Sequence, residues 1–172
     1  MATTLVSLEE YLSTTYEPDR EWVNGELRER NVGEFDHSRL QYWIAVRLGA
    51  QEARGEFIGF TEQRIRIGPR RYRIPDVCVL AEPSKHEPVI TTPPLLVIEI
   101  LSPSDEPGDL LEKLSDYQQF GIPHIWIADP VRQRVFVFES GVLRPVADLG
   151  LRIENPAIEL DFRELFQKLR RD

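Results

Sequence analysis

The chain has 172 residues, a net charge of −8, 41% hydrophobic residues and a single cysteine. This length predicts one domain, spanning 1–172, that is large enough to bury its own core. The acidic balance argues against non-specific nucleic-acid binding over the whole surface, and one cysteine excludes an internal disulfide. The chain begins without a basic and apolar leader and contains no apolar run of about 20 residues, so we expect a cytoplasmic protein.

The first part of the chain carries clear helix and hairpin signals. Ser7 stands three residues before Glu10, the spacing of a capping box, and predicts a short helix over 8–13. Asn24-Gly25 supplies the positive φ angles of a tight turn and predicts a β-hairpin with strands at 21–23 and 26–30. Apolar residues then recur near helical spacing and predict a long helix over 35–53.

The rest of the chain alternates strands with two further helices. Apolar runs between turn signals predict strands at 57–60, 63–67, 72–80, 95–101, 124–128 and 135–138. Asp109, with Glu112 three residues later, predicts a helix cap, and that helix should end at Gly121. A last helix is expected over 162–170. The order predicts antiparallel hairpins combined with one βαβ crossover, hence a mixed α/β (α+β) fold.

Five arginines cluster in the segment that contains the second and third of these strands. They are Arg64, Arg66, Arg70, Arg71 and Arg73. A local basic patch of this kind can bind nucleic acid, although a solvated hairpin with alternating side chains also explains it. We favour the solvated hairpin.

Glu99 is the most informative single residue. It stands inside a continuously apolar strand, which is typical of a strand covered on both faces. A carboxylate buried there is costly unless it is paired or bound to a metal. A salt bridge to an arginine would therefore explain it as well as a metal would.

Asp76 becomes informative when it is taken together with Glu99. It follows Pro75 at the start of an apolar segment, and the two carboxylates lie on successive strands that one loop separates. If these strands are neighbours, the carboxylates converge and raise each other's pKa. A hard cation such as Mg²⁺ or Mn²⁺ relieves that repulsion, and the main-chain carbonyl of Ile100 could add a third oxygen ligand.

These residues resemble a known nuclease pattern. Pro75-Asp76 followed by Glu99-Ile100-Leu101 is similar to the PD-(D/E)xK motif, with leucine in place of the lysine. The longer pattern resembles the Uma-two family of restriction-endonuclease-like proteins over nearly the whole chain. Its matching segments are 8–12, 21–27, His37, 99–105, Lys113, Tyr117 and 121–130. The resemblance implies a restriction-endonuclease-like core, in which helices flank a mixed central sheet.

The resemblance also implies roles for further residues. Lys113, from the following helix, would replace the lysine that is missing at Leu101. An acidic residue of the hairpin, Glu21 or Glu26, would supplement the metal site, and of the two Glu26 is weakly favoured. His37 would lie near the start of the long helix, close to the site.

Each of these residues also has an ordinary structural explanation. Without the resemblance, Lys113 would be an exposed helical lysine and His37 a residue that caps or solvates a helix end. Tyr117, four residues after Lys113, shares its helical face and is more typical of a core position than of a pocket.

The sequence therefore predicts a Mg²⁺- or Mn²⁺-dependent endonuclease that hydrolyses phosphodiester bonds of nucleic acid, with DNA as the favoured substrate. Metal would be held by Asp76, Glu99 and the Ile100 carbonyl, with Lys113 orienting water or neutralising charge. The alternative is a catalytically inactive protein of the same fold that binds nucleic acid or protein, which the acidic charge and the missing motif lysine favour. A homodimer is expected, because many nucleases of this superfamily cut two strands with two sites.

Overall fold

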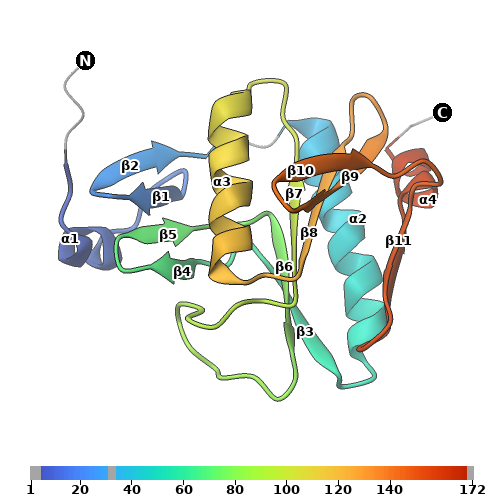
Figure 1. The fold of residues 1–172 in the computed structure, drawn as a ribbon, viewed down its shortest axis with the longest axis horizontal. Coiled ribbons are helices and arrows are strands. Elements are labelled where there is room, and N and C mark those ends of the chain that lie inside the picture. Colours follow the sequence, from blue (N-terminus) through green and yellow to red (C-terminus); the bar gives the residue numbers. More distant parts are fainter. Residues whose placement is uncertain (1–4, 31–33, 170–172) are drawn as a thin grey trace.

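The computed structural model describes residues 5–30 and 34–169, and the description below is confined to them. This part of the chain folds into four helices and twelve strands (Figure 1). The helices are α1 (Leu8–Ser13), α2 (Phe35–Glu52), α3 (Pro107–Phe120) and α4 (Phe162–Gln167). None of these helices has the length and apolar character required to cross a membrane.

The strands form three sheets. The four-stranded sheet has the order β2-β1-β5-β4 and consists of β1 (Arg20–Val23), β2 (Glu26–Glu29), β4 (Ile65–Gly68) and β5 (Arg71–Arg73). The six-stranded sheet has the order β10-β9-β8-β7-β6-β3 and consists of β3 (Phe57–Thr61), β6 (Val77–Ala81), β7 (Leu96–Ile100), β8 (His124–Asp129), β9 (Arg134–Glu139) and β10 (Val142–Pro145). A two-stranded sheet pairs β11 (Gly150–Ile153) with β12 (Ile158–Asp161).

The six-stranded sheet is mixed, as expected. The strands β7 and β8 are parallel and are joined through α3, while β6 pairs with β7 and β8 with β9 in antiparallel fashion. The sheet lies between α2 on one side and α3 on the other (Figure 1). The predicted crossover and the predicted hairpin at Asn24-Gly25 are both confirmed.

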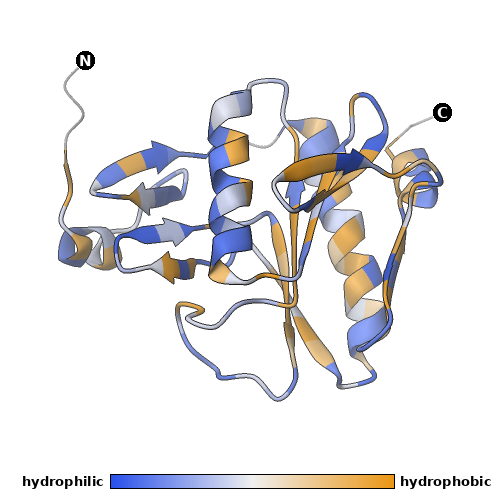
Figure 2. Ribbon diagram, viewed as in Figure 1, coloured by the Kyte–Doolittle hydropathy of each residue, from blue (hydrophilic) through white to orange (hydrophobic). Residues whose placement is uncertain are grey.

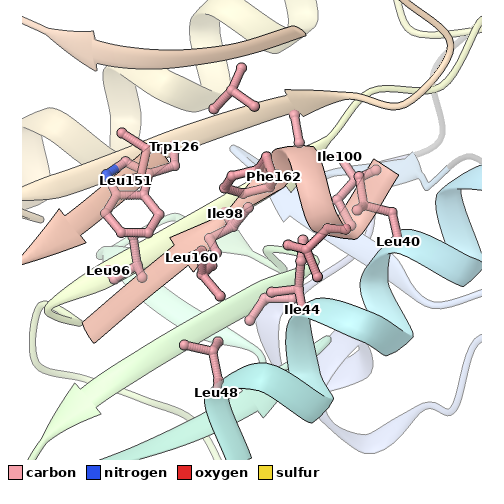
Figure 3. Close-up of a cluster of buried hydrophobic side chains, with 14 of the residues drawn as sticks. Leu40, Ile44, Leu48, Leu96, Ile98, Ile100, Trp126, Leu151, Leu160 and Phe162 are labelled. Carbon is pink, nitrogen blue, oxygen red and sulfur yellow. The ribbon is translucent and has the colours of Figure 1, made fainter. Parts of the chain in front are cut away.

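The larger hydrophobic cluster fills the space between the six-stranded sheet and α2. Leu40, Ile44 and Leu48 repeat every four residues along α2 and point toward the sheet and α4 (Figure 3). They pack with residues such as Ile98 and Phe162, both fully buried. Figure 2 shows this apolar content as orange along α2 and the sheet, whereas α3 is mostly blue.

One predicted strand is wrong in an instructive way. The segment 72–80 is two strands in two different sheets, β5 and β6, and the chain crosses between the sheets at Ile74, Pro75 and Asp76. Proline cannot donate a ladder hydrogen bond, so it ends the pairing of β5. Asp76 therefore lies where the two sheets meet.

Three smaller predictions also need correction. The helix expected to be capped by Asp109 begins instead at Pro107, with Glu106 as its N-cap and no capping hydrogen bond from a side chain. It ends at Gly121 as expected, with a left-handed φ of 95°. Strands β10, β11 and β12 were not expected, and α4 ends at Gln167, while position 170 lies outside the described residues.

Candidate active site

Asp76 and Glu99 lie next to each other at the edge of a cavity. The strands β6 and β7 pair Val77 with Ile98, and continuing this register by one residue places Asp76 opposite Glu99. Both carboxylates are buried, each with 5% of its surface exposed. They line a cavity of about 220 Å³ together with His37, Ile100 and Lys113.

The backbone of Ile100 belongs to the same site. Its N–H donates to Oδ2 of Asp76 at 2.7 Å. In an extended strand the N–H and the carbonyl of one residue point to the same edge, so the Ile100 carbonyl also faces Asp76. The predicted third oxygen ligand is therefore on the correct side of β7.

Glu99 is held by two side chains of α3. Lys113 and Tyr117 are one helical turn apart and share a face. The Lys113 ammonium lies 3.0 Å from the Glu99 carboxylate, and the Tyr117 hydroxyl donates to Glu99 Oε1 at 2.7 Å. Tyr117 is fully buried, so it is a core residue as expected, with its hydroxyl at the site.

Asp76 is held from two other directions. Arg30 donates to Oδ1 at 2.7 Å, and the His37 Nε2 lies 3.3 Å from Oδ2. His37 therefore lies near the start of α2 and close to the site, as expected. The side chain of Gln41, one turn later, donates to the Asp76 carbonyl.

Glu21, rather than Glu26, joins this group from the hairpin. Its Oε1 lies 3.0 Å from the Lys113 ammonium and accepts the Ile74 N–H at 2.9 Å. Of the described residues, Glu26 is not among those that line the cavity. The register of the hairpin accounts for the difference, because Glu21 lies opposite Arg28, which lines the cavity, whereas Glu26 lies opposite Val23, which does not.

A buried arginine supports Glu21. Arg73 has 1% of its surface exposed and donates to Glu21 Oε2 at 2.8 Å. Its Nε and Nη2 both donate to Asp116 on α3, at 2.8 and 2.6 Å. The sequence analysis missed Arg73 and Asp116 as parts of the site, and only the position of Arg73 two residues before Pro75 could have suggested it.

The pKa values of the two carboxylates are shifted in opposite directions. Burial raises the pKa of Glu99 to about 7, and the charge of Asp76 acts in the same sense, while Lys113 opposes it. Burial would also raise the pKa of Asp76, but the hydrogen bond with His37 and the charges of Lys113 and Arg30 outweigh it and lower that pKa. Asp76 therefore favours the ionised form, whereas Glu99 binds a proton more readily than an ordinary glutamate does.

Lys113 stays charged despite its burial. Burial by itself would lower the pKa of the ammonium, but Glu21, Glu99 and Asp76 together raise it. The cavity as a whole is acidic, because seven carboxylates line it against four arginine and lysine side chains. Such a cavity attracts a cation.

A second cavity, of about 390 Å³, is more apolar. It lies beside β3 and β6 and is lined by residues such as Ile58 and Phe60, with Glu87 as its single carboxylate. It lacks paired acidic groups, so the first cavity is the candidate active site.

The mixed sheet between helices, with paired carboxylates on adjacent strands, defines a protein of the restriction-endonuclease-like fold. Residues 8–165 match the model of the Uma2 family, whose description is "Putative restriction endonuclease", and the chain belongs to this family. Family and fold together support a nuclease-like function.

One solved structure supports the same fold. It is described as a "putative nuclease belonging to DUF820" from Anabaena variabilis and is similar to this chain with a TM-score of 0.82 and 21% sequence identity. The match covers 96% of this chain and 99% of that one. No curated protein matches the chain.

Proposed function

We propose that the protein is a metal-dependent nuclease that hydrolyses phosphodiester bonds of nucleic acid. Asp76, Glu99 and the Ile100 carbonyl would hold Mg²⁺ or Mn²⁺. The observation that carries this proposal is the pair of buried carboxylates on adjacent strands, of which Glu99 has a pKa raised to about 7. The charge of Asp76 contributes to the raised pKa of Glu99, and a hard divalent cation would offset that repulsion.

The donor set also fits magnesium in number. Among the described residues, no group of three or more His, Cys, Asp or Glu side chains is arranged to hold a metal ion. Mg²⁺ is commonly bound by one or two carboxylates plus waters and substrate phosphate, so two carboxylates and a carbonyl are sufficient. When bound, the metal lowers the pKa of a coordinated water and stabilises negative charge on the phosphoryl oxygens.

The surrounding residues would prepare the two ligands. Tyr117 and Lys113 hold the Glu99 carboxylate in one orientation, and His37 does the same for Asp76. Glu21 keeps the Lys113 ammonium beside Glu99, where its charge offsets that of the carboxylates. In this proposal Glu21 replaces Glu26 as the acidic residue that the hairpin contributes.

A binding module without catalysis is the second candidate. It is favoured by Asp76, both of whose oxygens already have protein partners, and by Lys113, which has three protein acceptors nearby. Such a protein would retain the fold and use the cavity surface to bind nucleic acid or a protein. Metal binding separates the two candidates, because the binding module does not require a metal.

Cleavage assays test the nuclease directly. Labelled single-stranded, duplex and branched DNA and RNA would be incubated with Mg²⁺ or Mn²⁺ and with native protein, Asp76→Ala, Glu99→Ala or Lys113→Ala. Glu154→Gln, on an exposed segment, is the matched control. We expect metal-dependent cutting by the native protein and the control, and none by the three site variants. Cutting that survives Asp76→Ala would refute the proposed site.

Calorimetric titration with Mn²⁺ is the companion measurement. We expect binding by the native protein and loss of binding in Asp76→Ala. Binding without cleavage of any substrate would support a nuclease whose substrate differs from those tested, whereas no binding would support the binding module. Sedimentation at micromolar concentration tests the expected homodimer against the 20.0 kDa monomer.

A further inference from the structure

Four side chains with fixed positive charge line the candidate active site, and two of them are committed to contacts within the protein. The Lys113 ammonium has three N–H donors and three acceptors, namely the Ile74 carbonyl at 3.0 Å, Glu99 and Glu21. The guanidinium of Arg73 uses Nε, Nη1 and Nη2 on Glu21 and Asp116, and only 1% of the Arg73 surface is exposed. Both groups are therefore internal to the protein.

The other two cations, Arg28 and Arg30, retain spare donors. Arg28 bonds Glu112 at 2.5 Å through Nη1 alone, with Asp109 3.9 Å away, and its side chain is 28% exposed. Arg30 bonds Asp76 through Nη2 and lies 3.4 Å from Glu62 through Nη1, with 14% of its side chain exposed. A guanidinium has five N–H donors, so each arginine has more donors than these contacts use.

Arg28 and Arg30 are also placed side by side. Arg28 lies in β2 and Arg30 directly follows the last residue of that strand, Glu29, so the two are at most about 7 Å apart along the chain. The strand β2 is the outer strand of its sheet and runs toward the N-terminal end of α3 (Figure 1). Both arginines line the cavity.

We propose that Arg28 and Arg30 bind two backbone phosphates of the nucleic acid whose cleavage is proposed above, on which this inference rests. The seven carboxylates of the cavity would repel a polyanion, and these two arginines are the lining arginines that are partly exposed and have donors to offset that repulsion. Guanidinium binds phosphate in a bidentate manner and carries no sequence preference through such contacts. The role is thus in substrate binding, while Lys113 and Arg73 position the carboxylates.

The dependence of nucleic-acid affinity on salt concentration gives the number of phosphate contacts. Fluorescence anisotropy would measure binding of labelled single-stranded and duplex DNA and of RNA, with Ca²⁺ as the metal, over a series of salt concentrations. Each lost phosphate contact should lower the slope of log affinity against log salt by about 0.7–0.9. Arg28→Ala and Arg30→Ala should each show this loss and bind about 10-fold more weakly or worse.

Two further variants make the comparison specific. Arg66→Ala removes an exposed arginine of the hairpin β4–β5, which does not line the cavity, and should leave the slope unchanged. Arg28→Lys keeps the charge but loses the bidentate geometry, so it should retain the slope and lose affinity. Arg28 does not contact Asp76, so its variants are free of the effect that Arg30→Ala has on that carboxylate.

The outcomes separate this inference from the proposed function. Reduced slopes for both alanine variants with a native slope for Arg66→Ala would support it. Native slopes for Arg28→Ala and Arg30→Ala, with tight binding by the native protein, would overturn it and leave the proposed nuclease intact. If the native protein binds none of the three probes, the inference falls, whereas the proposed function is decided by the cleavage and Mn²⁺-binding assays.

Discussion

The two faces of the six-stranded sheet are packed through different kinds of interaction. Between the sheet and α2, the packing is mainly apolar, with Leu40, Ile44 and Phe162 among the buried side chains (Figure 3). On the face toward α3, apolar packing gives way at the cavity to a chain of buried ions in which Arg73 and Lys113 connect three carboxylates.

The difference shows where stability and function are separated in this fold. Burial of apolar area is favourable and non-directional, so the α2 face tolerates modest changes in geometry. A buried ion pair roughly breaks even against its desolvation, so the charges on the α3 face are weak evidence for stability. Their geometry fits a function that needs two carboxylates held close together.

The largest expected effect is on the charged face. Arg73→Ala would remove the buried cation that Glu21 and Asp116 share, although Lys113 remains beside Glu21 and Arg71 beside Asp116, and should lower the free energy of unfolding by about 3–5 kcal/mol. Urea unfolding measures it, with exposed Arg152→Ala as the control, expected within about 0.5 kcal/mol of native. A loss below about 1 kcal/mol for Arg73→Ala would contradict the described contacts of Arg73 with Glu21 and Asp116.

The apolar face should respond through cavity formation. Ile44→Ala removes a fully buried side chain and should cost about 2–5 kcal/mol in the same urea assay. Val46→Ala, on the exposed side of the same helix, should cost much less. Similar losses for the two variants would argue against the packing of α2 on the sheet.

A pH effect of about 3 kcal/mol should distinguish the faces further. The pKa of Glu99 in the folded protein is about 7 against an ordinary 4.5, so the folded state binds the proton more tightly and native stability falls as pH rises from 4.5 to 7. Glu99→Gln carries no such group. Its stability relative to native should therefore be greater at pH 8 than at pH 5.

The measurement is urea unfolding of both proteins at the two pH values, with Glu154→Gln as control. The lowered pKa values of Asp76 and Glu21 act in the opposite direction, since their contribution is lost as pH falls, but both proteins share them. A pH-independent difference between Glu99→Gln and native would contradict the raised pKa.

Mg²⁺ should stabilise the folded protein through the charged face, so the stabilisation should require Asp76. If Asp76 and Glu99 hold Mg²⁺, a concentration 100 times the dissociation constant should stabilise the native protein by about 2.7 kcal/mol. Thermal unfolding with and without Mg²⁺ should show this shift for native protein and for Ile44→Ala, and no shift for Asp76→Ala. An equal shift in Asp76→Ala would show that the metal binds at a site that does not include Asp76.

The smallest effects concern one glycine in each of the two flanking helices. Gly49 lies in α2 with nothing within 4 Å of an added Cβ, so Gly49→Ala should stabilise by about 0.5–1 kcal/mol. Gly121 ends α3 at a φ of 95°, so Gly121→Ala should destabilise by about 1 kcal/mol. Thermal unfolding of the two variants should show shifts of opposite sign, and shifts of the same sign would contradict these backbone conformations.

Local signals in the sequence predicted most elements but not all. The hairpin at Asn24-Gly25 and the helix that ends at Gly121 follow from backbone preferences that act over a few residues. The strands β11 and β12 also carry an alternating apolar pattern, with Leu151 and Ile153 in one and Ile158 and Leu160 in the other. Such alternation favours strands, although none was predicted there. The start of α3 was misplaced because Asp109 imitates a cap, while Pro107 is the better signal.

The sequence by itself determined the family, the mixed sheet, and Asp76, Glu99 and Lys113 as the residues to examine. Only the tertiary structure decided that segment 72–80 divides between two sheets, that Glu21 rather than Glu26 faces the site, and that Lys113 has no N–H to spare. The reason is physical. Helix ends, turns and strand periodicity are set by neighbouring residues, whereas burial, pKa and the pairing of charges depend on side chains brought together from distant parts of the chain.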